Sequence, residues 1–472
     1  MRPSWLALTR ADLPLLTGGA FITLGAAAAS MRIGGIFSVG ALMAIALFFA
    51  FVAGFMAFPH LTIALMIPTF ALIPAIKVLA VPWIGPLKDL MTIAAITAAA
   101  ALVIQRAGEG AKQRGDAAAA ALVCFLVGLY FLNLGGRLEH DLAWSQGVRL
   151  ISEPMLLLLV GLVLPQARRT LRWAMASLVA TGVFVALTGI AQQVLGEERL
   201  VDLGYSYTLQ VRSIDGRLRS FGTMDESFAY AGFLLLALAA LLFWRRRGIL
   251  VGIAGTVIAV GLACAQVRTS VVIAIALLGL WLACSQRPTV AAFFIVAAVS
   301  AAAATLIWSS SGTETRTVRA GPSLFLTING RTEGWKIVLD DPRTWAVGKG
   351  VGEIGVAAER ATYSVSRRER KKNQASAVDS GYFALIADVG CIGLIVFLAL
   401  ATRLFNLARR ATRGRSNAGW LALGFLMVLL LDAVTRDSFT GFPAAFLGML
   451  LVGLSLAAAE EEMEHGRGVA AS

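Results

Sequence analysis

The sequence predicts an all-α membrane protein, a bundle of about 12 to 14 transmembrane helices with one large polar loop. Hydrophobic residues make up 58% of the 472-residue chain and charged residues 15%, whereas an average soluble domain has about 25% charged residues. The mean hydropathy is +0.77. Runs of roughly 20 apolar residues, long enough to cross a bilayer as a helix, recur almost from end to end. We therefore expect one polytopic unit and not several soluble domains.

The apolar runs give the expected helices in chain order, and polar segments separate them. The expected spans are 13–30, 35–58, 61–82, 89–104, 117–134, 148–164, 173–194, 227–244, 249–267, 270–284, 289–308, 381–402, 418–434 and 441–459. No small-residue cleavage site follows the first run, so we expect it to be retained. The chain then divides into four regions: N-terminal helices (1–116), central helices with an outer loop at 195–226 (117–308), the large loop (309–380), and C-terminal helices with a tail (381–472).

The orientation follows from Lys and Arg in the short loops, which favour the cytoplasmic side. When the spans alternate, the basic clusters of the short loops fall on one side. These are Arg106/Lys112/Arg114, Arg168/Arg169/Arg172, Arg245–Arg247, Arg287 and Arg403/Arg409/Arg410/Arg413/Arg415. We expect this side to be cytoplasmic, with both termini there. The four cysteines lie within or at the ends of apolar runs without metal-ligand spacing, so no metal site is expected.

The outer segments 135–147, 195–226 and 309–380 are also basic, and the positive-inside rule does not explain this. Phosphate or diphosphate binding is the simplest reason, because the planar guanidinium group of arginine matches phosphate oxygens. The alternative is solvation or contact with anionic lipid head groups, above all for the cluster Arg367–Lys372. No nucleic acid is expected as a partner.

Two outer segments place arginines where a span begins. The first runs from Arg217 through Arg219 to Asp225 and Glu226, where two arginines and two carboxylates could bind phosphate and orient a hydroxyl. Its structural alternative is a cap for the following helix. The second is a tight turn with a lone charge, Arg268, at membrane depth, which is by default a candidate functional residue. Its alternative is snorkelling to the interface.

Two further segments lie at the ends of the large loop. Around Arg331 the spacing of apolar residues predicts a short amphipathic helix on the membrane surface, whose first turn could hold a phosphate. Asp379 precedes the next span, with Tyr382 just inside it. A carboxylate at this boundary is suited to act as a base, and the alternative role for Asp379 is an N-cap.

Together these segments, over roughly 217–393, resemble the O-antigen ligase / O-antigen polymerase superfamily of bacterial membrane glycosyltransferases. In that family an Arg precedes a Gly-Thr pair at a span entrance, as in RSFGT (219–223), and a short turn with a central Arg resembles VRT (267–269). A Gly-Arg start to an amphipathic helix resembles 330–335, and its Gly-x-Gly tail resembles 348–350. A span entrance followed by Gly-x-x-Gly resembles 379–393.

The resemblance implies a GT-C-like helical bundle in the bacterial inner membrane, with a periplasmic loop that carries short amphipathic helices. It implies transfer of a glycan from undecaprenyl diphosphate to another glycan or to a lipid A-core, without metal or other cofactor. Arg219, Arg268 and Arg331 would bind the diphosphate, with Arg217 beside them and Asp225, Glu226 and Tyr382 in support. Membrane lipids and a regulator of chain length are further expected partners.

The chain departs from the ligase pattern at one position. Ligases carry a His where this sequence has Asp379, and the nearest spare outer histidine is His140, far away in the sequence. Asp379 could replace the His as base, or His140 could fold over the site. The difference favours a polymerase that extends an O-antigen, capsule or exopolysaccharide chain over a lipid A-core ligase. A transporter or flippase of an anionic lipid-linked solute is the alternative from another class.

Overall fold

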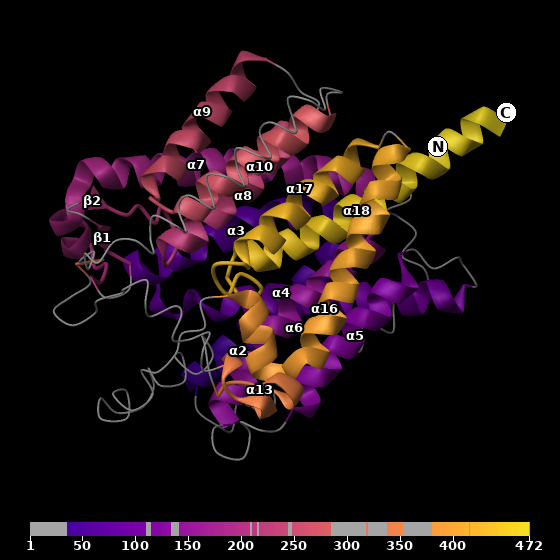
Figure 1. Cartoon of the computed structure of the whole chain (residues 1–472), viewed down its shortest axis with the longest axis horizontal. Helices are drawn as coiled ribbons and strands as arrows, with labels where there is room; N and C mark the ends of the chain where they lie inside the picture. The colour runs from indigo at the N-terminus through magenta and orange to yellow at the C-terminus, as the bar shows by residue number, and fades with distance from the viewer. Residues whose placement is uncertain are drawn as a thin grey trace.

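The computed structural model describes residues 35–109, 115–133, 141–207, 210–214, 217–243, 248–284, 318–319, 338–353, 380–414 and 416–471. The chain forms a helical bundle (Figure 1). Six helices are long and apolar enough to cross a membrane: α3 (Pro59–Leu79), α4 (Pro86–Gly108), α6 (Asp141–Val163), α7 (Ala167–Asp202), α16 (Gly381–Arg413) and α18 (Ala444–Ala471). The shorter apolar helices are α2 (Gly35–Ala57), α5 (Ala117–Leu132), α8 (Ser227–Phe243), α9 (Ile249–Cys264), α10 (Arg268–Cys284) and α17 (Asn417–Asp432).

Each of these helices covers an expected span, which confirms the helical positions, while the expected spans 13–30 and 289–308 lie outside the described residues. The helix starts follow from local chemistry. Proline opens α3 and α4, where its missing N–H leaves no hydrogen bond unmade. The side chain of Asp116 accepts a hydrogen bond from the Ala119 N–H and caps α5, and Ser416 caps α17 in the same way.

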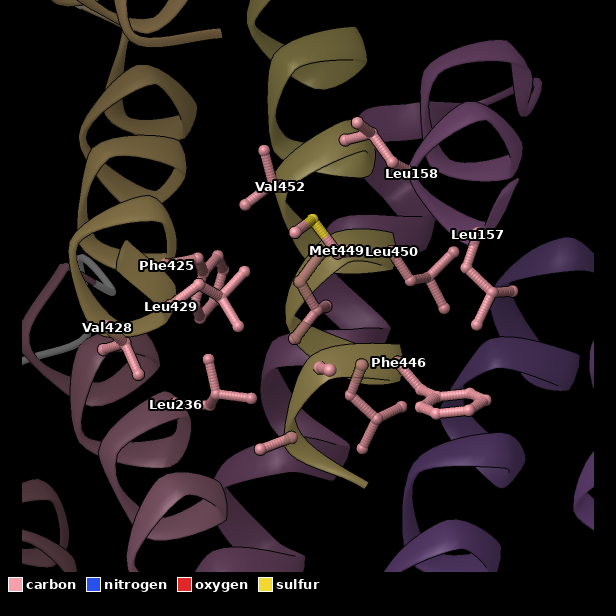
Figure 2. Packing of buried hydrophobic residues seen from close by; sticks show 14 of the residues in the cluster. Leu157, Leu158, Leu236, Phe425, Val428, Leu429, Phe446, Met449, Leu450 and Val452 are labelled. Atoms are coloured by element: carbon pink, nitrogen blue, oxygen red, sulfur yellow. The ribbon is translucent and has the colours of Figure 1, made fainter. Parts of the chain in front are cut away.

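Helix α18 lies at the centre of the packing, between α6 and α17 (Figure 2). Leu450 and Phe446 of α18 are fully buried, as are Leu157 and Leu158 on the α6 side. The backbones of α6 and α18 approach each other closely because glycines face each other there. A Cβ atom on Gly161 would lie 2.5 Å from the Leu454 nitrogen, and one on Gly453 would lie 3.0 Å from the Leu162 nitrogen. Small residues at such crossings are typical of membrane helix pairs.

Basic residues of three expected cytoplasmic loops lie at one end of the bundle. The Nη1 atom of Arg106 donates to the Val163 carbonyl at 2.8 Å, and Arg403 pairs with Asp116 at 2.6 Å. The backbone N–H of Arg168 donates to Glu461 at 3.0 Å. The grouping agrees with the alternation of spans. The assignment of this end to the cytoplasm stays a prediction.

Helix α16 is not the continuous span expected over 381–402. Gly390 has φ 72° and ψ −172°, a conformation open essentially only to glycine, and it divides α16 into two segments. The rings of Tyr382 and Phe397 lie 6.3 Å apart, whereas 15 residues of straight helix would separate them by roughly 22 Å. The segment before Gly390 therefore folds back along the segment after it, as Figure 1 shows near α13 (Pro342–Val347).

Residues 348–350, which follow α13, are called the α13 loop here. This loop supplies a hydrogen bond where the fold-back interrupts α16. The Lys349 N–H donates to the Ala387 carbonyl at 2.7 Å, and the side-chain amide of Asn133 donates to the Asp388 carbonyl at 2.7 Å. Gly348, with φ 83°, lies against the Asp388 backbone, where a Cβ atom would come within 2.6 Å of the carbonyl oxygen. The α13 loop and the end of α5 thus fix the fold-back.

Three two-residue strands form a small antiparallel sheet that the all-α prediction did not include. Strand β1 (Ser213–Ile214) lies between β2 (Arg217–Leu218) and β3 (Val318–Arg319). Ser213 pairs with Leu218 on one side and with Arg319 on the other. The sheet joins the expected outer loop 195–226 to the large loop 309–380. A single-turn 3₁₀ helix, η2 (Pro82–Ile84), connects α3 and α4.

Candidate functional site

The RSFGT segment (219–223) is hydrogen-bonded to the C-terminal half of α7. The carboxamide oxygen of Gln192 accepts from the backbone N–H groups of Phe221 and Gly222 at 3.0 and 2.8 Å. The carboxamide nitrogen of Gln192 donates to the Gly222 carbonyl at 2.7 Å. The Ser220 hydroxyl donates to the Gly189 carbonyl at 2.6 Å, and the Thr223 hydroxyl donates to Ala71 of α3 at 2.7 Å. Four of the five motif residues therefore have structural roles.

Glycine is required at position 222 of this segment. Gly222 has φ 58°, in the left-handed region, and a Cβ atom there would lie 2.5 Å from the ring of Tyr230. Tyr230 is fully buried in α8, so its ring cannot move aside. The turn at Gly222 directs the chain into α8.

Arg219 is buried against the start of α8. The residue is 8% exposed, and its guanidinium carbon lies 4.6 Å from the centroid of the Phe228 ring. Its Nε atom also lies 3.4 Å from the Ala265 carbonyl oxygen, in the turn that leads to Arg268. A guanidinium group over an aromatic face is held electrostatically by the ring. Burial keeps water from screening this charge, so an anion that reached it would be bound strongly.

A second arginine, which the sequence analysis missed, lies at the same ring. Arg436 follows α17, and its guanidinium carbon is 5.6 Å from the Phe228 centroid. Its Nε and Nη2 atoms both donate to Oδ2 of Asp432, the former at 2.6 Å. The Ser438 hydroxyl donates to the same oxygen at 2.7 Å. The available signal was a charged run, Asp432 to Asp437, between two apolar spans, and its position next to Arg219 could not be read from the sequence.

The turn after α17 (433–438) brings the predicted segments together. The backbone N–H of Gly381, two residues after Asp379, donates to the carbonyls of Ala433 and Arg436, each at 2.9 Å. The Ser380 hydroxyl donates to Ala433 at 3.2 Å. On the other side, the Thr435 hydroxyl donates to the hydroxyl of Thr269, the residue after Arg268, at 3.1 Å. Segments 219–228, 265–269 and 380–382 therefore meet around one turn.

The other predicted site residues have varied positions. Arg268 is exposed at the first position of α10, and the backbone of Arg217 lies in β2. Asp225 and Glu226 are exposed just before α8. Burial, and to a smaller extent the charge of Asp225, raise the pKa of Tyr205, whose ring packs on Phe221.

Tyr382 has a structural contact. Its hydroxyl donates to the Leu430 carbonyl at 2.9 Å, and its ring packs on Phe397 and Phe439. Arg331, Asp379 and His140 lie outside the described residues. Among the residues that the structure describes, no group of three His, Cys, Asp or Glu side chains could hold a metal ion.

A separate polar cluster lies between α4 and α6. Lys88 contacts Asp89 at 2.7 Å, and Arg149 contacts the same carboxylate at 2.9 Å. The Lys88 ammonium also lies 5.1 Å from the Phe442 ring, at the start of α18. Glu153, one turn deeper in α6, is 6% exposed, and its Oε2 atom has no hydrogen-bond partner.

Comparison of the chain with models of known protein families gives no match, and no curated protein matches it. The resemblance to the O-antigen ligase / polymerase superfamily therefore stays a prediction from the motifs.

Proposed function

We propose that this protein is a membrane glycosyltransferase of the O-antigen ligase / polymerase type in the bacterial inner membrane. It uses a glycan linked to undecaprenyl diphosphate at the periplasmic face. The observation that supports this most is the meeting of segments 219–228, 265–269 and 380–382 around the turn after α17, with the guanidinium group of Arg219 buried beside it. These are the segments whose motifs resemble the family.

The reaction needs positive charge near the leaving diphosphate, alignment of the acceptor hydroxyl with the anomeric carbon, and a base. The acceptor hydroxyl attacks the anomeric carbon of the donor glycan, and the bond from that carbon to the diphosphate oxygen breaks. The electron pair leaves with undecaprenyl diphosphate, while the hydroxyl proton passes to a base. Fixed guanidinium groups stabilise the negative charge that develops on the leaving group. Arg219, Arg268 and Arg331 have this role in the proposal, and Asp379 orients the acceptor hydroxyl and takes its proton.

Asp379 in place of the ligase histidine makes a polymerase the preferred member of the type. The products are then longer chains of an O-antigen, capsule or exopolysaccharide, with the growing glycan as acceptor. The GT-C-like architecture, the periplasmic position of the large loop and the cytoplasmic position of both termini belong to the same proposal. The described helical bundle with its six span-length apolar helices is consistent with it.

The glycans left on the lipid carrier of a deletion strain test the proposal. A polymerase predicts the accumulation of single repeat units on undecaprenyl diphosphate, and a ligase predicts long polymer that is not attached to its acceptor. Complementation with the Arg219→Ala variant should leave the deletion phenotype, and complementation with Arg403→Ala should restore the wild-type glycan. An unchanged glycan profile in the deletion strain would refute both forms of the proposal.

One observation favours the alternative class, a transporter or flippase. Glu153 is a buried carboxylate within a span-length helix, beside Lys88, Asp89 and Arg149, and ionisable residues at such positions often mark transport pathways. In sealed proteoliposomes, a flippase would move a labelled lipid diphosphate between leaflets without forming new glycosidic bonds. Loss of that movement in a Glu153→Gln variant would support the transporter.

A further inference from the structure

We propose that Arg436 is a further ligand of the lipid diphosphate and that Asp432 is the residue that positions it. This inference rests on the proposed function, because it names a residue that completes the same site. Neither residue belongs to a motif that carries the family resemblance. Arg436 packs against Phe228 and α8, and Asp432 holds it there.

The carboxylate of Asp432 holds Arg436 by one edge of its guanidinium group. Two N–H groups of its guanidinium donate to one carboxylate oxygen, Oδ2 of Asp432, and the Ser438 hydroxyl donates to that oxygen as well. Asp432 is 3% exposed, and its second oxygen, Oδ1, has no hydrogen-bond partner. The carboxylate therefore fixes one edge of the guanidinium group. The fork geometry of arginine leaves further N–H groups on the other edge for phosphate oxygens.

Arg436 lies close to Arg219, at the same aromatic ring. Their guanidinium carbons lie 5.6 and 4.6 Å from the centroid of one ring, Phe228, so they can be no farther apart than the sum of these distances. Both side chains are largely buried, at 8% exposure for Arg219 and 15% for the Arg436 side chain. Asp432 offsets one of these two positive charges, and a phosphate group that reached the cluster would meet the guanidinium N–H groups that do not face Asp432. A diphosphate has the charge and extent to contact both.

Helix α8 has a glycine, Gly232, where the guanidinium group of Arg436 packs against it. Gly232 lies one turn after Phe228, and a Cβ atom there would come within 2.6 Å of Nη2 of Arg436. Its backbone is helical, so the reason for glycine is close packing: an added Cβ atom would meet the guanidinium group first and would also lie 3.2 Å from the Cβ atom of Ala444. Gly232→Ala is thus a change that displaces the guanidinium while the charge and its ion pair partner remain in the chain.

Arg436 also contacts the start of α16 through its backbone. The Arg436 carbonyl accepts the backbone N–H of Gly381, two residues after Asp379. The turn that carries Arg436 therefore also fixes the start of α16. A diphosphate bound between Arg219 and Arg436 would therefore lie near the turn that holds the start of α16.

The test measures binding of undecaprenyl diphosphate and undecaprenyl monophosphate to the purified full-length protein in nanodiscs. We expect Arg436→Ala to weaken diphosphate binding by about 10- to 100-fold, the usual effect of losing charged hydrogen bonds to phosphate, with a smaller effect on the monophosphate. Arg436→Lys should recover part of the affinity. Gly232→Ala should also weaken binding, because the added Cβ atom displaces the guanidinium group.

The matched control is Arg403→Ala, because Arg403 also pairs with an aspartate, Asp116, but at the opposite end of the bundle. It should bind undecaprenyl diphosphate as the wild type does. The role of Asp432 is tested by a double-mutant cycle. Asp432→Asn should weaken binding in the wild-type background and should add little in the Arg436→Ala background, because it acts through Arg436.

If Arg436→Ala and Gly232→Ala bound undecaprenyl diphosphate as tightly as the wild type does, the inference would be overturned. The proposed function would remain intact. If the wild type itself did not bind undecaprenyl diphosphate, the proposed function would fail with it. Should Arg436→Ala not fold, Arg436→Lys and Gly232→Ala decide the matter, since both keep a positive charge near Asp432.

Discussion

The guanidinium groups of Arg219 and Arg436 lie at one aromatic ring, that of Phe228, although the two arginines come from turns far apart in the sequence. Arg219 enters from the motif segment before α8, and Arg436 enters from the turn between α17 and α18. Asp432 fixes Arg436, and the network of Gln192 fixes the backbone beside Arg219. The site is therefore assembled by tertiary packing around a single side chain.

The first prediction concerns Phe228. Phe228→Leu keeps an apolar side chain of similar size but removes the ring that both guanidinium groups contact. Loss of cation–π contacts of this kind should reduce the affinity for undecaprenyl diphosphate about 3- to 10-fold. The matched control is Phe184→Leu, because Phe184 lies exposed on α7. Equal losses in both variants would show that the ring has no specific role.

The second prediction concerns the fold-back of α16. Gly390→Ala places a Cβ atom 2.5 Å from the Ala346 carbonyl oxygen at φ 72°, so it should destabilise the protein by about 1–3 kcal/mol. Gly128→Ala is the control, because Gly128 lies in regular helix α5 with nothing within 4 Å of an added Cβ atom. That variant should be neutral or slightly more stable. Thermal unfolding in detergent compares the two, and equal midpoints would contradict the fold-back.

The third prediction concerns the crossing of α6 and α18. Gly453→Ala forces the two backbones apart, because an added Cβ atom meets the α6 backbone. Overpacking of this kind should destabilise the protein by about 1–3 kcal/mol or more. Gly252→Ala in α9, where an added Cβ atom meets nothing within 4 Å, should have no such effect. A Gly453→Ala protein with the wild-type unfolding midpoint would show that the crossing is looser than described.

The fourth prediction concerns pH. A side-chain hydrogen bond from Arg403 is the main cause that holds the pKa of Asp116 below its ordinary value. A carboxyl group with a lowered pKa in the folded state stabilises the protein above its unfolded pKa, and this contribution disappears as the pH falls through the folded pKa. Asp116→Asn keeps the helix cap but removes the charge.

The variant should therefore unfold at a lower temperature than the wild type at neutral pH, and the difference should disappear as the pH falls below the ordinary pKa of an aspartate and through the lowered pKa of Asp116. The effect should be small because the pair is partly exposed. Thermal unfolding of both proteins across this pH range measures it. A difference that stayed constant with pH would mean that the ion pair does not stabilise the folded state.

The sequence was sufficient to predict the helices but not their internal breaks. Apolar length predicts where a helix lies, and the described helices cover the expected positions, but several extend past the expected ends, as α7 does at 167–202 against 173–194. The fold-back of α16 was missed because residues 381–402 are apolar whether the chain runs straight or reverses. Gly390, the first glycine of the Gly-x-x-Gly pattern, was the available signal, and its role becomes clear only from its φ of 72° and the contact between Tyr382 and Phe397.

The sequence predicted the part of the candidate site that depends on local patterns and missed the part that depends on tertiary packing. The position of Arg219 at a helix entrance follows from a local pattern, and the structure places it in the cluster. Arg436 was missed because a charged run between two apolar spans is typical of any loop. Its contact with Phe228 depends on how α17 packs against α8, which no local pattern specifies. The roles of Arg331 and Asp379 stay predictions.

The central claim is that the cationic cluster at Phe228 binds a lipid diphosphate for glycan transfer. Its most direct test supplies purified protein in proteoliposomes with an undecaprenyl-diphosphate-linked repeat unit and measures glycan length together with released undecaprenyl diphosphate. We predict that the wild type and Arg403→Ala lengthen the glycan and release the carrier, and that Arg219→Ala, although folded, does neither. Undiminished glycan length and carrier release with Arg219→Ala would contradict the claim.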